Sequence, residues 1–155
     1  MLSKPQFTAA LANANICAPE QLVGVSEIEI ARLERTLNLR LPQQYKTFLQ
    51  SCGQGAGRFF TGTDMFFPGV EQLRNAAEAL LQENHETFQL PADAVVFSMH
   101  QGYQFNYFHS SEGDDPAVYH YMEGEGLPVL THESFSSFLL DAIEQHERIM
   151  SRRRI

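Results

Sequence analysis

The sequence predicts an α+β fold with one central antiparallel sheet and helices packed mainly on one face of it. Two observations carry this prediction. Apolar residues recur at helical spacing near both ends of the chain, and strand-like segments follow one another between residues 94 and 132. Strands grouped in the middle with helices around them are typical of α+β proteins. A length of 155 residues fits a single domain that can bury its own core.

Residues 26–53 carry the clearest pattern, that of two short amphipathic helices. Ser26 and Glu29 form a capping box at the start of the first helix, and Asn38 suits its end. Pro42 suits the first turn of the second helix, which Gly53 is placed to terminate. The apolar positions are Ile30, Leu33 and Leu37 in the first helix and Tyr45, Phe48, Leu49 and Cys52 in the second.

This stretch resembles the SMI1/KNR4 family of the SUKH superfamily. The residues that carry the resemblance are Ile30, Leu33, Glu34, Leu37, Leu41, Pro42, Tyr45, Phe48, Leu49 and Gly53. Strands around 95–97 and 119–121 and the start of the last helix are also similar, so the resemblance covers nearly everything after residue 25. The sequence departs from the family at Asn38, where glycine is frequent, and at Cys52, where asparagine is common. Because the motif residues are mostly apolar, they indicate a fold more than an activity.

The remaining elements follow from local periodicity and turn residues. Residues 1–25 form an N-terminal helix and connector, 26–150 the SMI1/KNR4-like domain, and 151–155 a basic tail. Short aromatic runs at 58–60 and 65–67 predict a hairpin. The predicted helices outside the motif span 3–14, 70–84 and 135–148, and the predicted meander strands span 94–100, 103–109, 117–122 and 128–131.

The net charge of −8 argues against direct nucleic-acid binding and suits a basic protein partner. No apolar run approaches the length of a membrane-spanning helix, and no export signal is recognisable, so a cytoplasmic protein is expected. Cys17 and Cys52 lack metal-ligand spacing. A buried free thiol is the simpler interpretation of Cys52, with a disulfide to Cys17 left open.

Catalytic motifs are absent from the sequence, so neither an enzyme nor a cofactor is predicted. His100, His109 and His120 come from successive predicted strands, and with Asp114 and Asp115 they could form a metal site. They have no closely spaced liganding pair, which disfavours that interpretation. For Glu34, a structural hydrogen bond or salt bridge is favoured over catalysis.

The family resemblance implies a non-enzymatic protein-binding module. Bacterial proteins of this resemblance are commonly immunity proteins that bind and neutralise a cognate toxin domain, often a nuclease. The alternatives are a regulatory scaffold of cell-wall synthesis or signalling and, less favoured, a metal-dependent enzyme. Strand order places the loops 110–116 and 123–126 at opposite ends of the third meander strand. The candidate partner-binding residues, chosen for charge and aromatic content, are Gln101, Tyr103, Glu112, Asp114, Asp115, Glu123 and Glu125.

Overall fold

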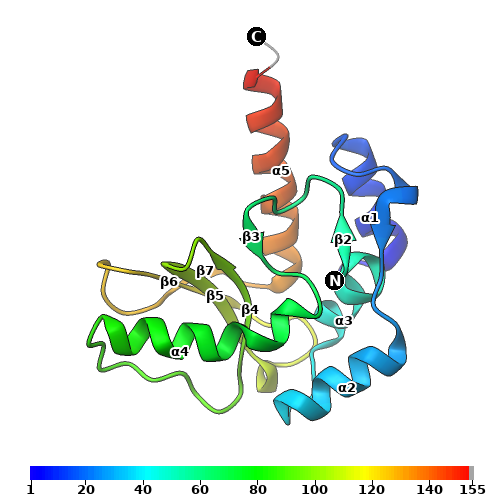
Figure 1. Ribbon diagram of the computed structural model, residues 1–155. Coiled ribbons are helices and arrows are strands. Elements are labelled where there is room, and N and C mark those ends of the chain that lie inside the picture. Colours follow the sequence, from blue (N-terminus) through cyan, green and yellow to red (C-terminus); the bar gives the residue numbers. More distant parts are fainter. Residues whose placement is uncertain (154–155) are drawn as a thin grey trace.

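The computed structural model describes residues 1–153 and confirms the α+β architecture (Figure 1). Seven strands form a two-stranded ribbon, β1-β2, and a five-stranded antiparallel sheet in the order β3-β4-β5-β6-β7. The helices are α1 (Lys4–Asn13), α2 (Glu27–Leu37), α3 (Gln43–Cys52), α4 (Leu73–Glu83) and α5 (Phe135–Arg153). The strands are β1 (Leu22–Val23), β2 (Gly55–Ala56), β3 (Thr63–Asp64), β4 (Ala94–His100), β5 (Gln104–His109), β6 (Val118–Met122) and β7 (Val129–His132).

The predicted meander is confirmed, and both of its faces are covered. Phe105 and Tyr107 of β5 stack with Tyr121 and Tyr119 of β6 on the face that α4 covers. Phe108 lies on the opposite face, against α3 and α5, with α1 packed on α3. Alternation along a strand sends successive side chains to opposite faces, so the aromatic residues at both parities of these strands fill a core on each side of the sheet. The sequence alone left open which face forms the core.

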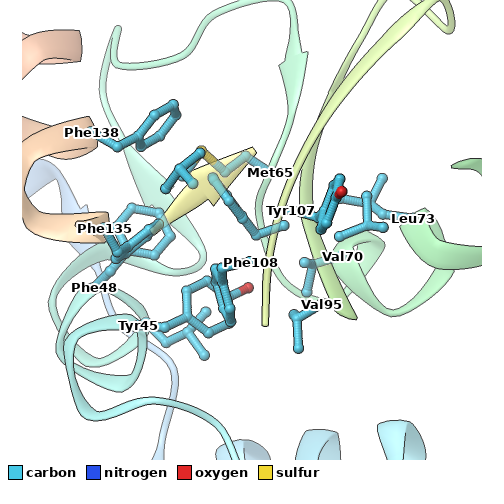
Figure 2. Close-up of a cluster of buried hydrophobic side chains, with 14 of the residues drawn as sticks. Tyr45, Phe48, Met65, Val70, Leu73, Val95, Tyr107, Phe108, Phe135 and Phe138 are labelled. Carbon is cyan, nitrogen blue, oxygen red and sulfur yellow. The ribbon is translucent and has the colours of Figure 1, made fainter. Parts of the chain in front are cut away.

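An aromatic cluster joins α3 and α5 to the sheet. Tyr45 of α3 contacts Phe108 of β5 and Phe135 of α5, with ring centroids 5.2 and 5.5 Å apart. Figure 2 shows Tyr45, Phe108 and Phe135 on one side of the strands and Tyr107 with Leu73 on the other. The motif aromatics therefore form the centre of the fold, which agrees with a structural role.

The two motif helices begin and end as the sequence predicts. The Ser26 hydroxyl accepts from the Glu29 amide, and Asn38 ends α2 in the left-handed conformation at φ 53°. Between the helices, Glu34 Oε2 accepts a hydrogen bond from the Leu41 amide at 2.8 Å, and Glu34 Oε1 lies 3.5 Å from Lys46 Nζ. Glu34 therefore makes both a hydrogen bond and a salt bridge of the kind that its structural interpretation requires.

The N-terminal segment packs onto the motif helices. Phe7 and Leu11 of α1 are buried, and the Phe7 ring lies 6.1 Å from that of Phe48. Cys17 and Cys52 are both buried free thiols, and burial raises the pKa of each. The segment predicted as a plain connector contains β1, which pairs with β2. That pairing was missed because two-residue strands leave no periodic signal.

The predicted hairpin of 58–60 and 65–67 is wrong. Phe59 and Phe60 lie in a turn, and the strand in this region is β3, which pairs with β4 at the edge of the sheet. Phe59 and Met65 are buried, and the Phe60 ring stacks on Phe138 of α5. The aromatic residues here fill the core instead of pairing as strands, which shows how strongly β-propensity depends on context.

Helix α5 is longer than predicted, because it runs to Arg153 instead of ending near 148. Ser151, Arg152 and Arg153 of the predicted basic tail are therefore helical, whereas Arg154 and Ile155 lie outside the described residues. Neither α5 nor any other helix within residues 1–153 is both long and apolar enough to cross a membrane.

Candidate functional site

The candidate partner-binding residues lie at two opposite ends of the sheet. Gln101 and Tyr103 lie in the β4–β5 turn and Glu123 and Glu125 in the β6–β7 turn. The Glu123 amide donates to the Tyr103 carbonyl at 2.9 Å, which holds these turns together. Glu112, Asp114 and Asp115 lie beyond the other end of β6. The predicted separation of the two loops is confirmed, so the seven residues do not form one continuous site.

The end with the β4–β5 and β6–β7 turns combines carboxylates with exposed apolar side chains. Leu127, Val129 and Leu130 expose 65, 57 and 53% of their surface. Within residues 1–153, β7 is an edge strand that pairs with β6 alone, and edge strands are common sites of pairing with another chain. Val129 and Leu130 are successive residues of β7 and so face opposite sides of the sheet, which leaves apolar surface exposed on both sides of this edge. Exposed apolar groups with polar neighbours are typical of protein interaction sites. We call this the turn surface, and its residues are Gln101, Tyr103, Glu123, Glu125, Leu127, Val129 and Leu130.

At the opposite end, two of the predicted residues have contacts within the fold. Asp115 accepts hydrogen bonds from the backbone amide and the hydroxyl of Ser136, in the first turn of α5. The backbone carbonyl of Asp114 accepts a hydrogen bond of 2.8 Å from the Gln44 amide at the start of α3. The Asp114 residue itself is exposed. Helix N-termini favour a carboxylate acceptor, so Asp115 stabilises α5.

Asp115→Ala is expected to lower the free energy of unfolding by about 1 kcal/mol, because the Ser136 amide loses its acceptor at a helix start. Asp114→Ala is the matched control, since its backbone contact survives the change. We expect the control to stay within about 0.5 kcal/mol of the wild type. Urea denaturation measures both. If Asp115→Ala were as stable as the wild type, the Asp115 carboxylate would not be needed for folding and would again be a candidate for partner binding.

The structure brings together only two of the three predicted histidines. His100 and His120 line one cleft, and the third histidine there is His132, which the sequence analysis did not include. His109 instead pairs with Asp93, with His109 Nδ1 and Asp93 Oδ1 3.0 Å apart, and this contact helps to lower the pKa of Asp93. Within residues 1–153 no group of three or more histidine, cysteine or acidic side chains is arranged to hold a metal ion.

The cleft lies between the sheet and α5 and has a volume of about 340 Å³. Its floor comes from β4, β5 and β6, one wall from β7 and the other from α5 and the turn before β3. We call it the polar cleft, and its lining residues are Phe60, Thr63, Ser98, His100, Gln104, Asn106, His120, Thr131, His132, Phe138, Asp141, Ala142 and Gln145.

A chain of hydrogen bonds fixes the orientation of the polar floor. Asn106 Nδ2 donates to Ser98 Oγ at 2.9 Å, and Asn106 Oδ1 lies 2.9 Å from His120 Nδ1. Because an amide oxygen can only accept, the proton of His120 sits on Nδ1 and its Nε2 is an acceptor. Burial lowers the pKa of His120, which keeps the imidazole neutral near pH 7.

The helix side of the cleft carries a carboxylate. Asp141 Oδ2 lies 3.0 Å from His132 Nε2 and accepts from Gln145 Nε2 at 2.9 Å. His132 Nδ1 lies 3.0 Å from Thr131 Oγ1. Both contacts of Asp141 are to Oδ2, and Oδ1 receives no hydrogen bond from the described part of the chain. One carboxylate oxygen is therefore available to a further donor.

Sequence reasoning missed His132 and Asp141 because they come from separate elements whose meeting depends on how α5 crosses the sheet. One signal was present in β5, where Gln104 and Asn106 alternate with Phe105 and Tyr107. Polar residues at every second position within an aromatic strand indicate a wet patch on one face.

The comparisons with known proteins agree with the fold. Residues 24–141 match the model of the SMI1 / KNR4 family (SUKH-1). The matched range begins just before α2 and ends within α5, so it includes the motif helices and the whole five-stranded sheet. A comparison with curated proteins returned no match. The resemblance predicted from the motif helices is confirmed.

Proposed function

Because the family match covers most of the chain, this protein belongs to the SMI1/KNR4 (SUKH-1) family, and we propose that it is an immunity protein that neutralises a cognate bacterial toxin domain. Members of this family are typically immunity-protein-like and generally non-catalytic. The proposed mechanism is occlusion, in which the protein covers the substrate groove of the toxin, often a nuclease groove.

The observation that carries this proposal is the turn surface. At one edge of the sheet it combines the exposed apolar residues Leu127, Val129 and Leu130 with the exposed acidic residues Glu123 and Glu125 of the β6–β7 turn. Apolar groups at the centre of an interface supply affinity, and charges at its rim steer association. A net charge of −8 complements the basic groove that a nuclease needs for phosphate binding.

Co-expression with the protein encoded by the adjacent reading frame tests the function directly. We expect the neighbour to arrest growth alone, this protein to restore growth, and the two to purify as a complex. A harmless neighbour that does not co-purify would contradict the immunity function.

Reversal of both turn carboxylates, Glu123→Lys with Glu125→Lys, is expected to lower the association rate with the toxin roughly ten-fold at low salt. The matched control is Glu27→Lys with Glu147→Lys, which changes net charge equally at exposed positions on α2 and α5. Stopped-flow association at several salt concentrations measures both. Equal slowing by both pairs of substitutions would show that net charge, and not the position of the carboxylates, sets the association rate. A wild-type association rate that does not depend on salt would contradict electrostatic steering and leave steric blocking as the mechanism.

A further inference from the structure

The polar cleft has a chemistry that the turn surface does not use. Its polar groups point to a ligand rich in hydrogen-bond donors, because Asp141 Oδ1 and His120 Nε2 are both available acceptors. Its aromatic wall consists of Phe60 and Phe138, whose rings are nearly parallel at 6° with centroids 6.0 Å apart. The cleft therefore offers acceptors on one side and a wall of stacked aromatic rings on the other.

The acidic charge of the cleft comes from a single carboxylate. Asp141 is the one acidic residue that lines it, and among the described residues no lysine or arginine does so. The neutral His120 adds no positive charge, and His132 directs its Nε2 toward the Asp141 carboxylate. The Asp141 side chain is 42% exposed, so solvent screens part of its attraction for a cation.

We propose that the polar cleft binds the guanidinium group of an arginine side chain that the toxin presents. The source of the arginine rests on the proposed function, whereas the chemistry rests on the cleft alone. A guanidinium carries five donors in a planar fork, which matches separated acceptors in a cleft that the stacked rings of Phe60 and Phe138 wall on one side. A lysine ammonium is compact and strongly hydrated, so it fits this arrangement less well.

Strand β7 connects the polar cleft to the turn surface. Val129 is exposed on the turn surface and pairs with His120 of the cleft floor, and Thr131 and His132 of the same strand line the cleft. A partner seated on the turn surface can therefore extend a side chain along β7 into the cleft. Arginine is among the residues that most often dominate the energy of protein interfaces when they fill a pocket.

The test uses the full chain and four small probes. N-acetyl-arginine methylamide presents the guanidinium, and the citrulline analogue has the same length with a neutral urea in its place. The lysine analogue and acetate report on a compact cation and on an anion. Binding is read from the imidazole C–H resonances of His100, His120 and His132 by NMR. We expect saturable shifts with the arginine probe at a dissociation constant on the order of millimolar, and at least ten-fold weaker binding of the other three.

Two substitutions on α5 then locate the binding charge. Asp141→Asn is expected to weaken the arginine probe at least ten-fold. Glu144→Gln makes the same chemical change outside the cleft, at an exposed residue paired with Arg148, and should leave binding unchanged. If Asp141→Asn fails to fold, Phe60→Asn removes one ring of the aromatic wall instead and is expected to weaken the arginine probe. Asparagine tolerates the φ of 55° at this position.

Several outcomes would overturn the proposal. They are the absence of saturable shifts, equal binding of arginine and citrulline, preferred binding of acetate, and unchanged arginine binding in Asp141→Asn. The probes need no partner protein, so the two proposals can fail separately. If the arginine probe binds but no toxin complex forms, the proposal for the cleft is supported and the immunity function is contradicted. If the toxin binds Asp141→Asn as tightly as it binds the wild type, the immunity function is supported, but the polar cleft is not part of the interface with the toxin.

Discussion

Replacing Tyr45 with alanine is expected to lower the free energy of unfolding by roughly 3–5 kcal/mol, the range for truncating a large buried aromatic residue. The Tyr45 side chain is fully buried, and its ring contacts Phe48 in α3, Phe108 in β5 and Phe135 in α5. The cavity would open where two helices meet the sheet, so it cannot close by movement of one element. Urea denaturation monitored by circular dichroism measures the loss.

Tyr45→Phe is the matched control, and it is expected to be at least as stable as the wild type. The Tyr45 hydroxyl is buried and has no hydrogen-bond partner within residues 1–153, and burial raises the pKa of its phenol. An unsatisfied buried polar group costs about 1–3 kcal/mol, which phenylalanine removes while keeping the ring. A Tyr45→Ala protein with an unchanged denaturation midpoint and lost toxin binding would instead place this residue in the interface.

The predictable part of the fold is the part encoded by short-range signals. Ser26 with Glu29 and Asn38 determine the ends of α2 through contacts within a few residues, so sequence alone locates them. The meander is predictable for a similar reason, because Gly102 and the polar loops punctuate strands that pair with their neighbours in sequence.

The errors occur where distant residues decide the structure. Phe59 and Phe60 have the composition of a strand, yet their rings pack against Phe7 and Phe138 from the two ends of the chain. Local propensity contains no information about those partners. The β1–β2 pairing joins residues 22–23 to 55–56 and was missed for the same reason.

The candidate sites divide in the same way. Gln101, Tyr103, Glu123 and Glu125 meet because adjacent hairpins place alternate turns at one end of a sheet, which strand order predicts. The polar cleft needs residues from β3 through β7 together with α5, so its composition follows only from the three-dimensional packing. Binding by either surface remains a prediction.

Gly24→Ala is expected to lower the free energy of unfolding by about 3 kcal/mol, at the upper end of the range for forcing extra atoms into a packed site. A Cβ built on Gly24 would lie 2.0 Å from the Gln50 carbonyl oxygen, which belongs to the backbone of α3. The adjoining Val25 amide donates to the Leu49 carbonyl at 2.8 Å, so the chain is held against this helix just before α2 begins. Neither backbone can move aside without breaking that contact.

Gly69→Ala separates this effect from the general consequence of losing a glycine. A Cβ at Gly69 meets nothing within 4 Å, and the residue does not need a positive φ. Alanine there restricts the unfolded chain, so we expect unchanged stability or a gain of about 0.4–1 kcal/mol. Thermal and urea denaturation of both variants give the comparison. Equal stability of the two would show that α3 does not approach Gly24 as closely as described, whereas a selective loss at Gly24 would show that this exposed glycine fixes how the chain enters the motif helices.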